Sequence, residues 1–167
     1  MLIRAEKISD KNAVRNLYLA AFETSAEAML VDALREINQI GISLVAEKYH
    51  HVIGHIMFSP VRLNGFPNVK IMGLAPMAVA PQFQRQGIGS MLVRTGFECC
   101  KRDNTGAVVV LGHPGFYPRF GFLPSSCYGI FSEYDVPDEV FMVFELEPGY
   151  LQGKSGMIKY LSVFNNL

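Results

Sequence analysis

The chain begins with apolar residues spaced for helices and then changes to runs typical of strands. Residues 2–6 predict a short first strand, and apolar residues three and four positions apart predict a helix over 11–22. A second helix is expected after the candidate cap Thr24-Ser25 and ends before Gly41.

Runs of β-branched and apolar residues then predict three consecutive strands, over 42–48, 52–63 and 69–79. Polar residues separate the first two runs. Asn64-Gly65 separates the second and third, and both of these residues tolerate positive φ. Each neighbouring pair of runs is therefore expected to form a hairpin.

Two prolines interrupt this strand pattern. Pro60 predicts a bulge or a sheet edge late in the second run, because proline cannot donate to a strand ladder. For the same reason Pro76 predicts an irregular third strand around Ala75-Pro76.

The remaining elements complete an α/β (α+β) pattern. We expect a helix over 87–102, a strand buried on both faces over 107–111, a short helix or turn over 114–120, and a last clear strand over 140–146. Strand 69–79 and the two elements after it form a βαβ crossover. This order predicts a single mixed sheet with helices on both faces.

Composition narrows the class of protein. The 167 residues fit one domain, and the formal net charge of zero argues against a general nucleic-acid binder. The three cysteines are odd in number and lack the spacing of a disulfide framework, which fits a reducing compartment, and the absence of a CxxC pair argues against structural zinc. No signal peptide or membrane span is recognisable, so we expect a cytoplasmic protein with no membrane partner.

Two glycines stand at the predicted start of helix 87–102. Gly87 and Gly89 let a ligand approach the unpaired N–H groups of the first helical turn, and Arg85 adds a cation, so an anion site is expected. The spacing alone fits equally well with glycines that only cap or pack the helix. The motif is not a P-loop, and Leu92 stands where a Rossmann fingerprint requires its third glycine.

The motif and the residues before it resemble the signature of a known family. The segment 79–89, with Gln84, Gly87 and Gly89 at the three defining positions, resembles the acetyl-CoA signature Q/R-x-x-G-x-G/A of the GCN5-related N-acetyltransferases, the GNAT family. The order of elements over 2–146 is also similar to that family.

Further along the chain, residues 111–122 end in "RFGF" and resemble the YhbS-like subgroup of predicted acetyltransferases. The tail from Phe141 to Tyr160 is similar to that subgroup's C-terminal extension. The resemblance implies an N-acetyltransferase domain over 1–147 and an extension over 148–167 packed on the same domain.

The resemblance implies a GNAT fold whose sheet is splayed at a cofactor slot, with acetyl-CoA as co-substrate and no metal. The pyrophosphate would lie against the helix start, and the pantetheine arm against the strand before it. The implied cofactor-binding residues are Met77, Ala78, Val79, Gln84, Arg85, Gln86, Gly87, Ile88, Gly89, Ser90 and Tyr117.

The implied reaction is direct attack of an amine on the thioester in a ternary complex. The backbone of Val79 would stabilise the oxyanion, and Tyr117 would protonate the leaving thiolate unless it only packs as an aromatic lid. Glu27 is the candidate general base, with Glu23 and His113 as alternatives. A water relay without a dedicated base is also open.

Other polar residues give weaker indications. His50-His51 lack a third metal ligand at useful spacing, and a catalytic role for the adjacent thiols Cys99 and Cys100 is not favoured over burial. Arg119 would contact a phosphate of the cofactor or bond carbonyl groups near Gly121.

Three functions remain open from the sequence. The first is an active N-acetyltransferase whose partners are acetyl-CoA and an unidentified amine of a small molecule or protein. The second is a catalytically silent acyl-CoA-binding or regulatory module on the same fold. The third is an interaction domain without a ligand. No nucleic-acid partner is expected, and a homodimer is neither indicated nor excluded.

Overall fold

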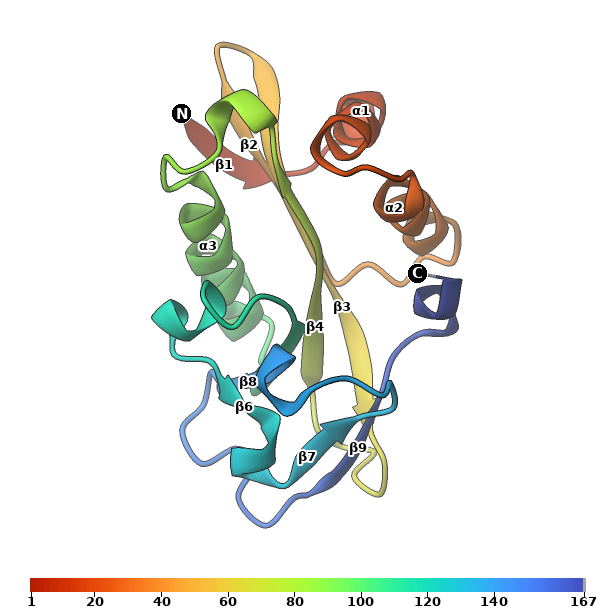
Figure 1. Cartoon of the computed structure of the whole chain (residues 1–167), viewed down its shortest axis with the longest axis vertical. Helices are drawn as coiled ribbons and strands as arrows, with labels where there is room; N and C mark the ends of the chain where they lie inside the picture. The colour runs from red at the N-terminus through yellow and green to blue at the C-terminus, as the bar shows by residue number, and fades with distance from the viewer. Residues whose placement is uncertain (167) are drawn as a thin grey trace.

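The computed structural model describes residues 1–166, in which three α-helices flank one mixed nine-stranded sheet (Figure 1). The α-helices are α1 (Lys11–Ala21), α2 (Ala26–Glu36) and α3 (Ile88–Arg102). The strands are β1 (Leu2–Ala5), β2 (Ile42–Lys48), β3 (His51–Leu63), β4 (Ile71–Val79), β5 (Ala107–Leu111), β6 (Leu123–Pro124), β7 (Ile130–Ser132), β8 (Phe141–Glu145) and β9 (Gly156–Lys159). The helices and strands predicted up to residue 111 are confirmed, and those predicted with stated bounds agree within two residues at each end; the second helix ends at Glu36, well before Gly41.

The sheet runs in the order β1-β2-β3-β4-β5-β8-β6, and β9 joins it alongside β3 and β7. β4 and β5 are parallel neighbours joined through α3, which confirms the predicted βαβ crossover. The pair β7 and β9 is also parallel, whereas the other pairs are antiparallel. The predicted mixed α+β sheet is therefore confirmed.

The helices cover opposite faces of the sheet, with α1 and α2 on one side and α3 on the other (Figure 1). The apolar stripe of α1, formed by Val14, Leu17 and Tyr18, is buried. On the other face α3 buries Leu92 and Phe97 among others. The helical spacing of apolar residues thus determines which side of each helix packs against the sheet. Within residues 1–166 no helix combines the length and the apolar character needed to cross a bilayer.

The strand connections follow the turn chemistry of the sequence. Tyr49 and His50 both have positive φ in the β2–β3 turn, and Gly65 has φ +86° between β3 and β4. The bulge of β3 lies between Ile56 and Phe58, so a bulge at Pro60 is wrong. Pro60 instead stands where β3 has passed the end of β2, which agrees with the alternative of a sheet edge.

The strand predicted over 140–146 is confirmed as β8, but it is not the last strand of the chain, because β9 follows it. β9 pairs with the end of β3 and with β7, so the C-terminal stretch is built into the sheet. β6 and β7 were also absent from the prediction. These three strands have two to four residues each, too few for a periodic pattern. Leu167, the last residue of the expected extension, lies outside the described residues.

Candidate active site

The site begins where β4 and β5 part. The two strands pair only from Ile71 to Gly73 on β4, opposite residues 107–109. β4 continues to Val79, so beyond Gly73 its edge on the β5 side has no strand partner among the described residues. Ala75 and Pro76 fall in the register shift against β3, which confirms the predicted irregularity. The sheet is thus splayed, as the fold prediction required.

The unpaired edge of β4 presents backbone hydrogen-bonding groups. Ala80 N–H donates to Ile53 O over 2.8 Å, whereas Val79 stands opposite Gly54. Because bonded and non-bonded pairs alternate in an antiparallel ladder, Val79 and, two residues earlier, Met77 direct their backbone groups away from β3. Those groups face the opening between β4 and β5.

This opening is part of a cleft of about 1300 Å³. Its walls come from five parts of the chain: the end of α1 and start of α2, β4 from 74 to 79, the loop and helix start over 83–90, the segment 111–119, and residues 136–140. Five separate segments therefore meet around one cavity, large enough for an extended ligand.

The start of α3 forms one end of the cleft. Gly87 is its N-cap, with φ +85°, and the first helical hydrogen bond runs from Met91 N–H to Gly87 O over 3.1 Å. The amides of Ile88, Gly89 and Ser90 therefore precede the helical ladder. Nothing stands within 4 Å of the position that a Cβ on Gly87 would occupy. This arrangement suits an anion, and Arg85 lines the same end.

The two glutamines of the motif differ in their contacts. Gln84 lines the cleft and donates from Nε2 to Val79 O over 3.0 Å, which ties the loop to the end of β4. Gln86 donates from Nε2 to Gln82 O over 3.4 Å and is not among the lining residues. Gln84 thus shapes the loop, and the side chain of Gln86 is engaged outside the cleft.

Tyr117 lies beside the opening on a short 3₁₀ helix, Tyr117–Phe120. Its ring packs edge-on against Phe116 and Phe122, with centroids 5.0 and 5.6 Å away. Among residues 1–166 its hydroxyl has no hydrogen-bond partner, and burial raises its pKa to about 12. The phenol is therefore protonated at neutral pH and available to donate into the cleft.

The three candidate bases occupy different positions. Glu27, in the first turn of α2, lines the cleft, and its Oε2 is buried without a hydrogen-bond partner among residues 1–166. His113 is exposed at the rim, and its carbonyl accepts from Phe116 N–H over 3.1 Å. Glu23 is exposed and does not line the cleft. Of the two carboxylates, only Glu27 has access to the site.

Arg119 is held by its own loop. Its Nη2 donates to Gly115 O over 3.3 Å, and its guanidinium lies 4.6 Å from the centre of the Phe116 ring. The carbonyl that it bonds is thus Gly115, not one near Gly121. Arg119 also lines the cleft, where it adds positive charge.

The remaining candidates lie away from the cleft. Cys99 and Cys100 lie on α3 outside the lining, and burial raises the pKa of the Cys100 thiol to about 12. His50 and His51 are exposed in the hairpin turn. Within residues 1–166 no three His, Cys, Asp or Glu side chains are grouped as ligands of one metal ion.

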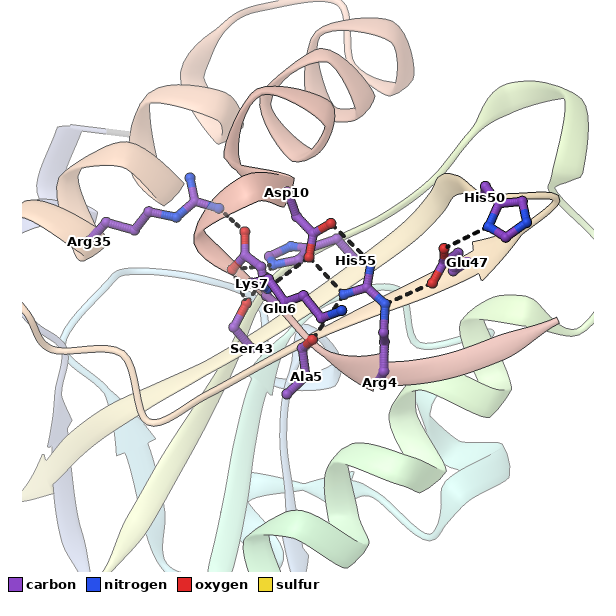
Figure 2. Close-up of polar contacts among 10 residues, drawn as sticks. All are labelled: Arg4, Ala5, Glu6, Lys7, Asp10, Arg35, Ser43, Glu47, His50 and His55. Carbon is purple, nitrogen blue, oxygen red and sulfur yellow. Dashed lines mark hydrogen bonds and ion pairs between the residues drawn. The ribbon is translucent and has the colours of Figure 1, made fainter.

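A buried polar cluster that sequence reasoning missed lies between the helices α1 and α2 and the sheet (Figure 2). His55 on β3 is fully buried, with Tyr18 Oη 2.7 Å from its Nδ1 and Ser43 Oγ 2.7 Å from its Nε2. Ser43 Oγ–H donates to Glu6, and Arg35 of α2 forms an ion pair with the same carboxylate. The cluster joins α1 and α2 to the sheet.

The donor count assigns the protons in this cluster. Because the single Ser43 proton goes to Glu6, His55 Nε2–H must donate to Ser43 Oγ. Burial lowers the pKa of His55, so we assign the ring as neutral, with Nδ1 accepting from Tyr18 O–H. For Glu6, burial acts to raise the pKa, but its contacts with His55 and Ser43 and the positive charge of Arg35 lower it overall. Since His55 is neutral, we assign the balancing positive charge to Arg35.

Comparison with known families and curated proteins gives consistent matches. The acetyltransferase (GNAT) domain family matches residues 39–124. The chain is 35% identical over 166 residues to the uncharacterized N-acetyltransferase YhbS of Escherichia coli K12, covering 99% of both chains. It is 37% identical over 135 residues to the uncharacterized N-acetyltransferase YjhQ of the same strain, covering 78% of this chain and 75% of that one.

Two solved structures match over nearly the whole chain. The YhbS crystal structure from E. coli in complex with CoA has a TM-score of 0.95 and 34% identity, covering 98% of this chain and 91% of that one. A GNAT family acetyltransferase from Brucella melitensis in complex with acetyl-CoA has a TM-score of 0.81 and 32% identity, covering 98% and 97%.

Proposed function

This chain belongs to the GNAT family of acetyltransferases, and we propose that it transfers the acetyl group of acetyl-CoA to a primary amine by direct attack in a ternary complex. The acceptor is an amine of a small molecule or of a protein. One observation carries the proposal: the opening between β4 and β5 places the bare start of α3 and the phenol of Tyr117 in one cleft.

The residues of the cleft fit acetyl-CoA, which supplies the acetyl group and a thiol leaving group when bound. The amides of the α3 start and Arg85 suit the pyrophosphate, and the open edge of β4 suits the amide groups of the pantetheine arm. The proposed cofactor residues remain Met77, Ala78, Val79, Gln84, Arg85, Gln86, Gly87, Ile88, Gly89, Ser90 and Tyr117. In this proposal Gln86 contributes through its backbone.

The amine must lose a proton to attack, and Glu27 is the proposed acceptor of that proton, directly or through water. Its carboxylate lies in the same cleft as the unpaired edge of β4. His113 at the rim is the alternative base. As the amine nitrogen bonds to the carbonyl carbon, the backbone N–H of Val79 is oriented toward the opening and can donate to the developing oxyanion.

Tyr117 is the proposed proton donor to the departing sulfur. Burial raises the pKa of its phenol to about 12, so the phenol holds its proton at neutral pH. The departing thiolate is a base formed in the cleft that Tyr117 lines, and the phenol can donate to it. The carbon–sulfur bond breaks as the phenol proton moves to sulfur, and the proton taken up by Glu27 then returns through water to Tyr117.

An assay for free CoA thiol with a panel of amines, run beside thermal unfolding with acetyl-CoA alone, tests this proposal. We expect acetyl-CoA to raise the unfolding temperature and at least one amine to release thiol. A shift without thiol release from any amine would support the silent acyl-CoA-binding module instead. No shift at saturating acetyl-CoA would contradict cofactor binding altogether.

A further inference from the structure

The part of the cleft beyond the proposed thioester slot differs in chemistry from the cofactor end. Phe22, Leu74, Val136 and Val140 line it with apolar surface. Val140 O accepts from Gly112 N–H over 2.9 Å, so this wall adjoins the loop that carries Tyr117. The acceptor side of the proposed reaction is thus mostly apolar.

Glu27 gives that apolar wall its charge. Among the described residues that line the cleft it is the only carboxylate, whereas the cations Arg85 and Arg119 lie in the helix-start and aromatic-turn segments. Its Oε2 is buried without a hydrogen-bond partner in residues 1–166. An unsatisfied buried carboxylate oxygen is costly, and a positively charged nitrogen bound in the cleft beside this side chain would offset part of that cost.

The ring of Phe22 is held in place. It stacks on Tyr18 with centroids 6.0 Å apart and an angle of 14° between the planes, and Tyr18 is fixed by its bond to His55. Phe22 nevertheless remains 37% exposed and faces the cleft. A partly exposed aromatic ring and a single carboxylate in one cleft offer one apolar contact and one charge contact.

We infer that the acceptor is an amine with one basic nitrogen joined by a short linker to an apolar body, as in an arylalkylamine. This inference rests on the proposed function. A polyamine would bring a second ammonium without a second carboxylate to pair it, and burial of an unpaired charge is unfavourable. A small polar amine would leave the apolar wall without a contact.

Steady-state acetylation of 2-phenylethylamine, ethanolamine and spermidine tests the inference. We expect kcat/KM for 2-phenylethylamine to exceed that for either other amine by at least about tenfold, equivalent to the burial of one small apolar group. Equal or higher kcat/KM for ethanolamine or spermidine would overturn the inference while leaving the acetyltransferase function intact.

Variants separate the apolar contact from the charge contact. Phe22→Ala and Val136→Thr should raise KM for 2-phenylethylamine and leave the kinetics of ethanolamine and the KM of acetyl-CoA unchanged. Glu27→Gln should weaken the reaction of all three amines. Leu19→Ala, which removes an exposed apolar side chain from the same helix outside the cleft, is the control. An equal effect of Phe22→Ala on 2-phenylethylamine and ethanolamine would contradict the assignment of the wall.

Calorimetric titration of the same amines into the protein saturated with CoA tests the acceptor class separately from the catalytic proposal. Preferred binding of 2-phenylethylamine without acetyl transfer in the assay would support the acceptor class and contradict the catalytic proposal. Absence of both binding and transfer for 2-phenylethylamine would overturn the inference.

Discussion

The ring of Tyr117 lies directly against the backbone of Gly112. A Cβ on Gly112 would stand 2.3 Å from Cε2 of Tyr117, which is closer than nonbonded atoms approach. Gly112 follows the last residue of β5 and donates its N–H to Val140 O over 2.9 Å. The end of β5 therefore fixes where the phenol lies relative to the cleft, and only glycine allows this approach.

Gly112→Ala should displace Tyr117 and lower kcat by about 10- to 100-fold, because small misplacements of a reacting group cost rates of that order. Gly115→Ala is the matched control, since it adds the same methyl group to the same loop with no heavy atom within 4 Å. Rates and unfolding temperatures of both variants check this. A Gly112→Ala enzyme as active as the control would show that the position of Tyr117 does not matter.

Tyr117→Phe should lower kcat by about 100-fold or more, the usual contribution of a general acid, and leave acetyl-CoA affinity unchanged. The phenyl ring keeps the packing against Phe116 and Phe122 and loses only the proton donor. Single-turnover rates and calorimetry measure the two effects separately. Unchanged turnover across the pH range would leave Tyr117 with the packing role alone.

Gly89→Asp should have opposite effects on stability and on cofactor binding. A carboxylate in the first turn of α3 favours the helix dipole, so the unfolding temperature should not fall. The same charge repels a pyrophosphate, and we expect acetyl-CoA affinity at least about tenfold below that of Gly89→Asn, or about 1.4 kcal/mol. The asparagine variant has nearly the same size, so the difference isolates charge. Equal acetyl-CoA affinities of the two variants would mean that the phosphates bind elsewhere.

Tyr18→Phe should destabilise the fold by about 1 to 3 kcal/mol, because Nδ1 of the buried His55 loses its donor while the stack on Phe22 is kept. Tyr49→Phe, at an exposed turn position, should change the free energy of unfolding by less than about 0.5 kcal/mol. Urea unfolding at pH 7.5 compares the two variants. Equal, small effects would mean that the hydrogen bond to His55 contributes nothing.

Stability should fall as pH is lowered through 6.5, the unperturbed pKa of His55. Burial lowers the pKa of folded His55, while the ionised groups around it, Glu6 and Asp10 on one side and Arg35 on the other, act in opposite directions. The unfolded chain therefore binds a proton that the folded chain does not, at up to about 1.4 kcal/mol per pH unit. Above pH 6.5 this contribution is fully present. Proton NMR of His55 in the folded protein should show no titration near 6.5, and a midpoint there would contradict the neutral assignment.

The elements that the sequence predicted are those with a strong local pattern. Residues 107–111 form a continuous apolar run, and β5 has the same bounds. Pro76 indicated the irregular stretch of β4, because a missing N–H is a local property. The glycines at 87 and 89 indicated the helix start because the positive φ that Gly87 adopts there is also a local preference.

The features that escaped prediction depend on long-range contacts. β9 is four residues long and forms a strand because β7 and the end of β3, which extends beyond β2, offer it partners. His55 stood as a lone histidine in an apolar run, with no sign that Tyr18 and Ser43 would bond both of its nitrogens. Phe22 and Val136 come from opposite halves of the chain, and only the folded sheet brings them to one cleft.

A crystal structure of the protein with CoA and 2-phenylethylamine tests the central claim most directly, because it locates the diphosphate and the thiol together. We predict phosphate oxygens within hydrogen-bond distance of the amides of Gly87 to Ser90, and the CoA sulfur beside the hydroxyl of Tyr117. A helix start free of phosphate density, with CoA bound elsewhere, would contradict the account.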